Sequence, residues 1–123
     1  MSRLKEDVRA FVELVVAGRT LEAMERFHAD NVELRENHAA PRVGKAFNLE
    51  WEHKSLASLA EPPRTVARAV TLDADEGVSM IEWDITFVPK GGRPLRLEEV
   101  AVQRWRDGRI VSERFFYEKF VDA

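Results

Sequence analysis

Residues 77–120 read GVSMIEWDITFVPKGGRPLRLEEVAVQRWRDGRIVSERFFYEKF, and two turn signals divide this stretch into three segments. The turn signals are Gly91-Gly92 and Asp107-Gly108, which are dipeptides that commonly connect antiparallel strands. The segments between them are rich in β-branched and aromatic residues, which favour strands. We therefore predict an antiparallel three-stranded meander, against which the earlier part of the chain packs.

The sequence before the meander predicts three helices and two further strands. Apolar residues at spacings of three and four indicate helices over residues 3–17 and 45–60, and Thr20 caps a helix between them. Alternation of apolar and polar residues predicts strands over residues 31–36 and 64–73. The expected fold class is α+β, with the helices on one face of the sheet.

The composition fits one domain spanning residues 1–123. Apolar residues make up 45% of the chain, and the net charge of −3 is unlike that of a nucleic-acid-binding domain. The absence of cysteine excludes disulfides and thiolate chemistry. The charged N-terminal stretch does not resemble a signal peptide, and no apolar run has membrane-spanning length. We therefore expect a soluble, cytoplasmic protein with neither nucleic-acid nor membrane partners.

The Gly91-Gly92 turn predicts the register of the first hairpin. A two-residue loop pairs Lys90 with Arg93, and counting back places Asp84 opposite Glu99. The other face of this hairpin is then consistently apolar. It contains Ile81, Trp83, Ile85, Val100 and Val102.

Asp84 and Glu99 are the strongest candidates for function. Like charges directly opposite each other destabilise a sheet, and burial would raise the pKa of one of them. Such a pair is tolerated where a cation, a shared proton or a basic partner relieves the repulsion. The pair therefore predicts acid–base chemistry, or a site for a cationic or hydroxyl-rich ligand. A solvated sheet face is the structural alternative.

Four short stretches in this order resemble a known superfamily. They are Ala23–Val32 (AMERFHADNV), Gly44 at the start of a helix, Arg104–Val111 (RWRDGRIV) and Arg114–Tyr117 (RFFY). Together they resemble the nuclear-transport-factor-2-like (NTF2-like) superfamily, in particular its SnoaL-like and ketosteroid-isomerase-like branch. The resemblance covers the whole chain. It implies a cone, in which three helices pack on a strongly curved, mainly antiparallel sheet and leave a cavity for a small molecule. It implies no particular reaction, because this fold hosts isomerases, cyclases, dehydratases, hydrolases and binding proteins.

The resemblance has two further implications for the sheet. Relatives often form homodimers through the outer sheet face, which the apolar face around Trp83 fits because it would otherwise be a large exposed patch. Relatives also favour a bulged three-residue loop at Arg106-Asp107-Gly108 over a two-residue loop, and the choice reverses the faces of the last strand. The bulged loop places Glu113, Phe115 and Tyr117 on the face of Asp84 and Glu99.

Comparison with the steroid isomerases argues against their activity in this protein. The resemblance places their general base at Glu36. It places the two donors of their oxyanion hole at Phe11 and Ala101, neither of which can donate a side-chain hydrogen bond. Because stabilisation of the developing charge is usually the largest catalytic contribution, we do not expect ketosteroid isomerase activity.

The remaining candidates come from the helix over residues 45–60 and from loops. His53 is expected to face the sheet, where it could hydrogen-bond Glu99 or Glu113, although a purely structural pair is the alternative. His38 could shuttle protons, although a single loop histidine is more often simply exposed. The expected catalytic residues are Glu36, Asp84, Glu99 and His53. The expected ligand-binding residues are His38, Trp51, Glu82, Glu113, Phe115 and Tyr117, with core packing as the alternative for the aromatic ones.

The sequence predicts neither a metal nor a cofactor. No histidine or carboxylate spacing is typical of a metal site, and no glycine loop precedes a helix in the manner of a phosphate-binding loop. Two functions stay open. One is an enzyme that transfers protons on an apolar, oxygenated substrate, with Glu36 or Asp84 as base and His53 or Tyr117 as donor. The other is a non-catalytic dimeric domain that binds a small ligand or only assembles.

Overall fold

The computed structural model describes residues 3–123 as helices packed on one curved sheet. The helices are α1 (Leu4–Val16), α2 (Thr20–Phe27) and α3 (Lys45–Ala57). The strands are β1 (His28–Glu36), β2 (Arg42–Val43), β3 (Arg64–Asp73), β4 (Val78–Phe87), β5 (Leu95–Arg106), β6 (Arg109–Phe116) and β7 (Val121–Asp122). The predicted α+β class and the mainly antiparallel sheet are confirmed. Within these residues, no helix is long and apolar enough to cross a membrane.

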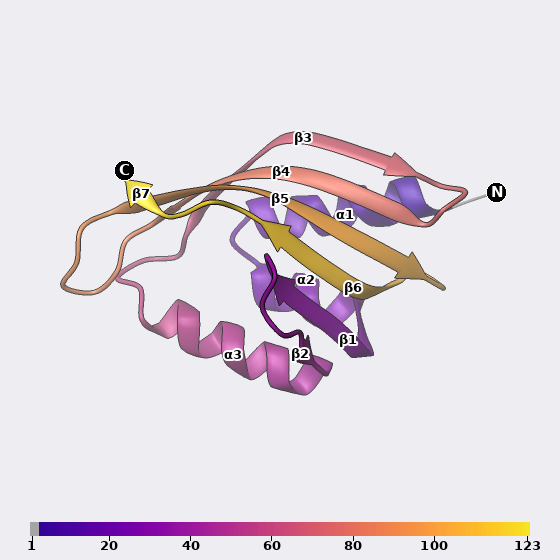
Figure 1. Cartoon of the computed structure of the whole chain (residues 1–123), viewed down its shortest axis with the longest axis horizontal. Coiled ribbons are helices and arrows are strands. Elements are labelled where there is room, and N and C mark those ends of the chain that lie inside the picture. Colours follow the sequence, from indigo (N-terminus) through magenta and orange to yellow (C-terminus); the bar gives the residue numbers. More distant parts are fainter. Residues whose placement is uncertain (1–2) are drawn as a thin grey trace.

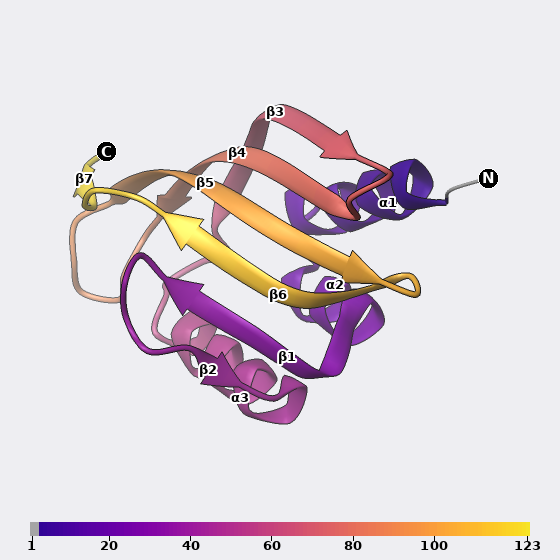
Figure 2. The same ribbon diagram turned by 45° about the vertical axis from the view of Figure 1, so that its right-hand side comes forward.

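The sheet has the strand order β2-β1-β6-β5-β4-β3, and β7 pairs with the start of β5. Only β1 and β6 run parallel among the described strands, because the chain passes through one helix, α3, and four strands, β2 to β5, before β6 returns beside β1. The three helices lie on one side of this curved sheet (Figures 1 and 2). Helix α1 contacts β3, whereas α3 contacts β1 and β2.

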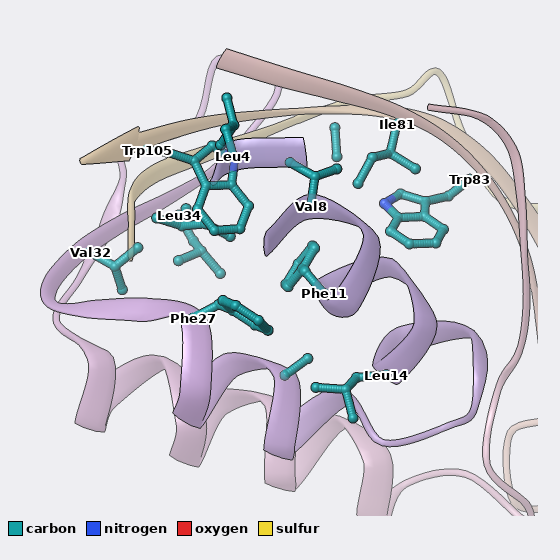
Figure 3. Packing of buried hydrophobic residues seen from close by; sticks show 13 residues of the cluster. Leu4, Val8, Phe11, Leu14, Phe27, Val32, Leu34, Ile81, Trp83 and Trp105 are labelled. Carbon is teal, nitrogen blue, oxygen red and sulfur yellow. The ribbon is translucent and has the colours of Figure 1, made fainter. Parts of the chain in front are cut away.

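The core lies between α1, α2 and the sheet (Figure 3). Helix α1 buries Leu4, Val8, Phe11 and Leu14, a row of helical spacing that faces the strands. The ring of Trp105 from β5 packs edge-on against Phe11 at 6.1 Å and close to Phe27 at 5.8 Å. Helix α3 buries only Asn48. The space between α3 and the sheet is therefore not filled by apolar side chains of that helix.

The predicted register of the β4–β5 hairpin is wrong by one residue. Trp83 lies opposite Glu99, and Asp84 lies opposite Glu98. The Gly91-Gly92 dipeptide is not a two-residue loop, because β4 leaves the ladder after Phe87 and the chain then pairs with residues 58–60, which follow α3. The backbone amides of Ala60 and Lys90 donate to the carbonyls of Val88 and Ser58 at 2.7 and 3.0 Å.

This one-residue slip separates the two acidic residues onto opposite faces of the sheet. Glu99 lies on the inner face with Trp83 and Ile81, whereas Asp84 lies on the outer face. The predicted dimer face therefore does not exist as one surface. Ile81, Trp83 and Ile85 point toward the helices, and Val100 and Val102 lie on the outer face.

The predicted three-residue loop between β5 and β6 is also wrong. Arg106 pairs with Arg109, so that Asp107 and Gly108 form a two-residue turn with φ values of 52° and 76°. The extra residue is instead Val111, because Trp105 pairs with Ile110 and Arg104 pairs with Ser112. This bulge restores the parity that the tight turn reverses. Glu113 and Phe115 therefore share the inner face with Glu99, although for a different reason from the one predicted.

Candidate functional site

A cavity of about 390 Å³ lies between the inner face of the sheet and the helices. This volume is within the range of small-molecule sites. Most of its wall is apolar, with Leu34, Trp83, Leu97 and Phe115 on the sheet side. Among the described residues that line it, four are carboxylic acids from four different elements. They are Glu36 of β1, Glu52 of α3, Glu99 of β5 and Glu113 of β6.

Glu99 has the most unusual environment of these acids. Its side chain points from the middle of β5 into the cavity and is 8% exposed. It makes no hydrogen bond with any group in residues 3–123. Burial, followed by the charges of Glu113, Glu36 and Glu52, raises the pKa of Glu99 to about 8. Glu99 is therefore mostly a neutral carboxylic acid at pH 7, which can donate a hydrogen bond or a proton.

Glu36 differs from Glu99 because it is paired with a positive charge. Arg42 forms an ion pair with one of its oxygens, and the Tyr117 hydroxyl donates to the other at 3.3 Å. Arg42 is itself fixed, because its Nε atom donates to the Asn48 side chain at 3.2 Å and its guanidinium lies 4.7 Å from the centre of a Trp51 ring. Glu36 and Glu99 therefore face one cavity in different surroundings, since Glu36 is paired with a cation and Glu99 is not.

Glu113 ends a chain of buried hydrogen bonds whose direction is fixed. The Trp105 indole N–H can only donate, and it donates to the Ser79 hydroxyl at 2.9 Å. Ser79 therefore donates its own proton to Gln103 Oε1 at 2.7 Å, which turns the amide nitrogen of Gln103 toward Glu113 Oε2 at 2.8 Å. The other oxygen of Glu113 lies 3.1 Å from His28 Nε2.

This chain of hydrogen bonds also bears on the tautomer of His28, that is, on which ring nitrogen carries the proton when the ring is neutral. When Glu113 is ionised, both of its oxygens accept, so the proton of a neutral His28 sits on Nε2. The Nδ1 atom of His28 then has no proton, and it has no hydrogen-bond partner in the part of the chain that the structure describes. Both oxygens of the buried Glu113 side chain thus have protein partners, in contrast to those of Glu99.

Glu52 is a cavity residue that sequence analysis missed. It lies on α3 one residue before His53, and that difference of about 100° around the helix decides which side chain faces the cavity. On α3 the side chains of Glu52, Ser55 and Leu56 line the cavity, and a search for polar residues at helical spacing could have found the pair Glu52 and Ser55. Burial is the main cause of a raised pKa of Glu52, and the charge of Arg42 opposes it.

Two other residues that sequence analysis missed belong to the same cavity. His28 begins β1, but the predicted strand began only at Asn31, so the inward side of His28 was not considered. Arg42 lies in β2, a two-residue strand within a segment that was predicted to be a loop. No local pattern marks either residue, because their partners are contributed by distant parts of the chain.

Asp84 is not a cavity residue, although it is 8% exposed. On the outer face of the sheet it accepts hydrogen bonds from Arg96, with Nε 2.9 Å from Oδ1, and from Arg68, with Nε 3.0 Å from Oδ2. These two arginines hold the pKa of the Asp84 carboxyl well below its usual range. The predicted repulsion with Glu99 does not arise. Asp84 is instead the acidic member of an ion-pair cluster with Arg68 and Arg96 on the outer face.

The other predicted site residues are divided between the cavity and the surface. Glu36, Trp51, Glu99, Glu113 and Phe115 line the cavity, and Tyr117 contacts it through Glu36. His53 is exposed on α3, so its predicted contact with the sheet is wrong. Glu82 is exposed on the outer face, and His38 is exposed in its loop beside Arg114. Within residues 3–123, no group of three or more histidine or acidic side chains has the arrangement of a metal site.

A curved, mainly antiparallel sheet that encloses a cavity with three helices is the architecture of the NTF2-like superfamily. The model of the SnoaL-like domain family matches residues 8–113, and the chain belongs to this family within the NTF2-like superfamily. No match was found among curated proteins.

Solved structures with the same fold support this assignment at low sequence identity. A proposed SnoaL-like polyketide cyclase from Mesorhizobium loti is 20% identical with a TM-score of 0.72, and the match covers 92% of this chain and 97% of that one. A proposed SnoaL-like polyketide cyclase from Jannaschia sp. CCS1 is 12% identical with a TM-score of 0.77, covering 93% and 86%. An NTF2-like protein of unknown function from Burkholderia pseudomallei is 18% identical with a TM-score of 0.79, covering 96% and 92%.

Proposed function

We propose that this protein binds a small molecule in its cavity and catalyses proton transfer of the isomerase, cyclase or dehydratase type on an apolar, oxygenated substrate. The observation that supports this most directly is Glu99. It is a buried carboxylic acid that faces the cavity, has no hydrogen-bond partner in the described part of the chain, and has its pKa raised to about 8. Perturbed acids in a cavity of ligand size are typical of catalytic sites.

The proposed mechanism uses the opposite protonation states of two acids. The neutral Glu99 carboxyl donates its proton to the carbonyl oxygen of the substrate, and the Glu36 carboxylate accepts a proton from the adjacent carbon. The product of this step is an enol, with Glu99 ionised and Glu36 protonated. Return of a proton to another carbon, or attack of the enol carbon on a second carbonyl group, then gives an isomerised or cyclised product.

Glu99 compensates for the donors that the steroid isomerases have and this chain lacks. The two corresponding positions, Phe11 and Ala101, contribute only hydrocarbon. Glu99 lies two residues from Ala101 on the same strand, and side chains two apart on a strand share a face. A protonated carboxyl can therefore reach the same part of the cavity from a neighbouring position.

The test is catalysis of solvent hydrogen exchange. A panel of cyclic ketones and 1,3-dicarbonyl compounds is incubated with the protein in D₂O, and loss of the signal of the hydrogen on the carbon next to the carbonyl is followed by NMR. We expect the wild-type protein to accelerate exchange in at least one class. Glu99→Gln should reduce that rate by about 10²–10⁴, the usual contribution of general acid–base catalysis. His53→Gln is the matched control, because His53 is exposed and should leave the rate unchanged.

A Glu99→Gln variant with the wild-type exchange rate would disprove the proposed role of this residue. If ligands bind in the cavity but none exchanges faster than in buffer, the second function holds, which is a non-catalytic ligand-binding domain. The specific observation in favour of that function is the loss of both isomerase donors at Phe11 and Ala101.

Homodimer formation stays a prediction that needs a different surface from the one first expected. The outer face of the sheet exposes Met80, Val100 and Phe116, each with about two-fifths of its surface accessible. Light scattering at micromolar concentration distinguishes the two states, and a monomer would contradict the prediction.

A further inference from the structure

We propose that the ligand of this cavity is an organic cation, namely a protonated amine on an apolar body. This inference rests on the proposed function only in taking the same cavity as the ligand site, and it specifies the substrate class. Two features support it: acids outnumber cations around the cavity, and two of the cavity-facing acids have no hydrogen-bond partner within residues 3–123.

The charges around the cavity do not balance. Among the described lining residues, Arg42 is the one permanent cation, against four acidic side chains. Arg42 is already engaged with Glu36, with Asn48 and with the ring of Trp51. Its charge is therefore matched within the protein. Glu113 has its own two partners, His28 and Gln103.

Two acids are left without such partners, and both line the cavity. Glu99 and Glu52 make no hydrogen bond to any group in residues 3–123, and Glu99 is 8% exposed. Placing acids in a mostly apolar cavity costs stability, which an apolar side chain of similar size would avoid. Such costs are commonly retained where function requires them. The missing donors for Glu99 and Glu52 can be supplied by a ligand.

The rest of the cavity wall identifies the kind of donor. A sugar or another hydroxyl-rich ligand needs several polar partners, but the wall around the acids consists mostly of side chains such as Trp83, Leu97 and Phe115. A single ammonium group with an apolar body matches such a surface. Its charge is complementary to the acids, and aromatic faces attract cations. An anionic ligand would meet like charge and is disfavoured.

The two functions of the cavity are compatible. Glu52, on α3, is the proposed counter-ion of the ammonium group, so that Glu99 remains available as the acid for the carbonyl group. The substrate class is then a carbonyl compound with a basic nitrogen. Attraction of the cation to the cavity increases when Glu99 also ionises.

Binding should therefore depend on pH with a defined sign. The groups that act on Glu99 are Glu113, Glu36 and Glu52, each of which disfavours its ionised form, and burial has the largest effect. As pH rises through about 8, Glu99 becomes a carboxylate and the affinity for a cation increases. A primary amine loses its own charge near pH 10, as lysine does, so its affinity peaks between these values.

The test compares three ligands of one shape and different charge. They are 2-phenylethylamine, 2-phenylethanol and 3-phenylpropanoate, with binding measured by isothermal titration calorimetry. At pH 8.5 we expect the amine to bind at least tenfold more tightly than the alcohol and the carboxylate to bind more weakly than both. Trimethyl(2-phenylethyl)ammonium, which cannot lose its charge, should continue to bind above pH 10. Near pH 7, amine binding should release protons, which titrations in buffers of different ionisation enthalpy will detect.

The matched variants are Glu52→Gln and Glu82→Gln. The first should lower the affinity for the amine and leave that for the alcohol unchanged, whereas the second removes an acid from the exposed outer face and should change nothing. Because Glu52 lies at the cavity wall and not in the buried core, we expect the variant to unfold at a temperature no lower than the wild type, and this cooperative unfolding will show that it is folded.

Equal affinities for amine and alcohol, or no amine binding up to millimolar concentration, would overturn the inference. Neither result would affect hydrogen exchange on neutral ketones, so the proposed function would stand. Conversely, tight amine binding without exchange of any ketone would refute the proposed catalysis and leave the cation site in place.

Discussion

The raised pKa of Glu99 has a consequence for stability that needs no substrate. In the folded protein Glu99 binds its proton up to a pKa of about 8, whereas the same group in the unfolded chain has a pKa of about 4.5. Between these values the folded state binds more protons than the unfolded state, so the free energy of unfolding falls as pH rises. The stabilising contribution is fully present below pH 4.5 and is lost as pH passes 8.

The size of this effect follows from the two pKa values. Each pH unit in the window costs about 1.4 kcal/mol, so the whole window amounts to ~5 kcal/mol. Water that enters the cavity reduces this value, and we expect a loss of about 2–5 kcal/mol between pH 5 and pH 9. Against the 5–15 kcal/mol that is typical of a domain, such a loss is large.

Substitution of Glu99 by glutamine removes the titration and keeps the shape. We expect the variant to match the wild-type protein within about 1 kcal/mol at pH 5 and to be more stable by about 2–5 kcal/mol at pH 9. The measurement is urea unfolding followed by tryptophan fluorescence at intervals of half a pH unit. Glu82→Gln is the control, because this exposed acid should leave the wild-type slope intact. If the free energies of unfolding of the wild-type protein and Glu99→Gln change with pH in parallel, the claim that folding raises the pKa of Glu99 is refuted.

Three further predictions concern the framework of the sheet. Asp84→Asn leaves two arginines without their shared carboxylate and should lower the free energy of unfolding by about 1–3 kcal/mol in urea titrations, without changing ligand binding. Gly77→Ala should cost more than about 1 kcal/mol in the same assay, because φ is +69° and the added Cβ would lie 2.9 Å from the Trp105 carbonyl oxygen. Trp105→Phe removes the donor to Ser79 and should cost about 1–3 kcal/mol in thermal unfolding, whereas an unchanged midpoint would show that the hydrogen-bond chain is not anchored there.

The helices and strands could be predicted well because their signals are local. The strand over residues 64–73 has the predicted limits, and α1 lies within one residue of the predicted range. Helix α2 begins at Thr20, which was predicted to be its cap, and Arg19 is the N-cap instead. The prediction was wrong in the register of the β4–β5 hairpin. The Gly91-Gly92 dipeptide is a strong local hairpin signal, but contacts between Val88–Lys90 and residues 58–60 override it. A slip of one residue then moves Asp84 to the other face of the sheet.

Some residues of the candidate site could likewise be identified from the sequence, whereas others could not. Glu36, Glu99, Glu113 and Phe115 were identified from the sequence, and the structure places all four at one cavity. Glu113 and Phe115 are there because two deviations cancel, since the tight turn at Asp107-Gly108 reverses the face and the bulge at Val111 reverses it again. His53 and Glu52 differ by one position on a helix whose apolar pattern is too weak to distinguish them.

The sequence by itself determined the fold class, the order of the elements and the family, because these depend on periodicity, turn residues and short motifs that neighbouring positions specify. Only the tertiary structure decided which carboxylate is neutral and which is charged. That outcome depends on groups far apart in the chain: Arg68 and Arg96 stabilise the carboxylate form of Asp84, whereas burial favours the neutral form of Glu99. Charge state is set by distance and solvent access in three dimensions, and no local pattern records either.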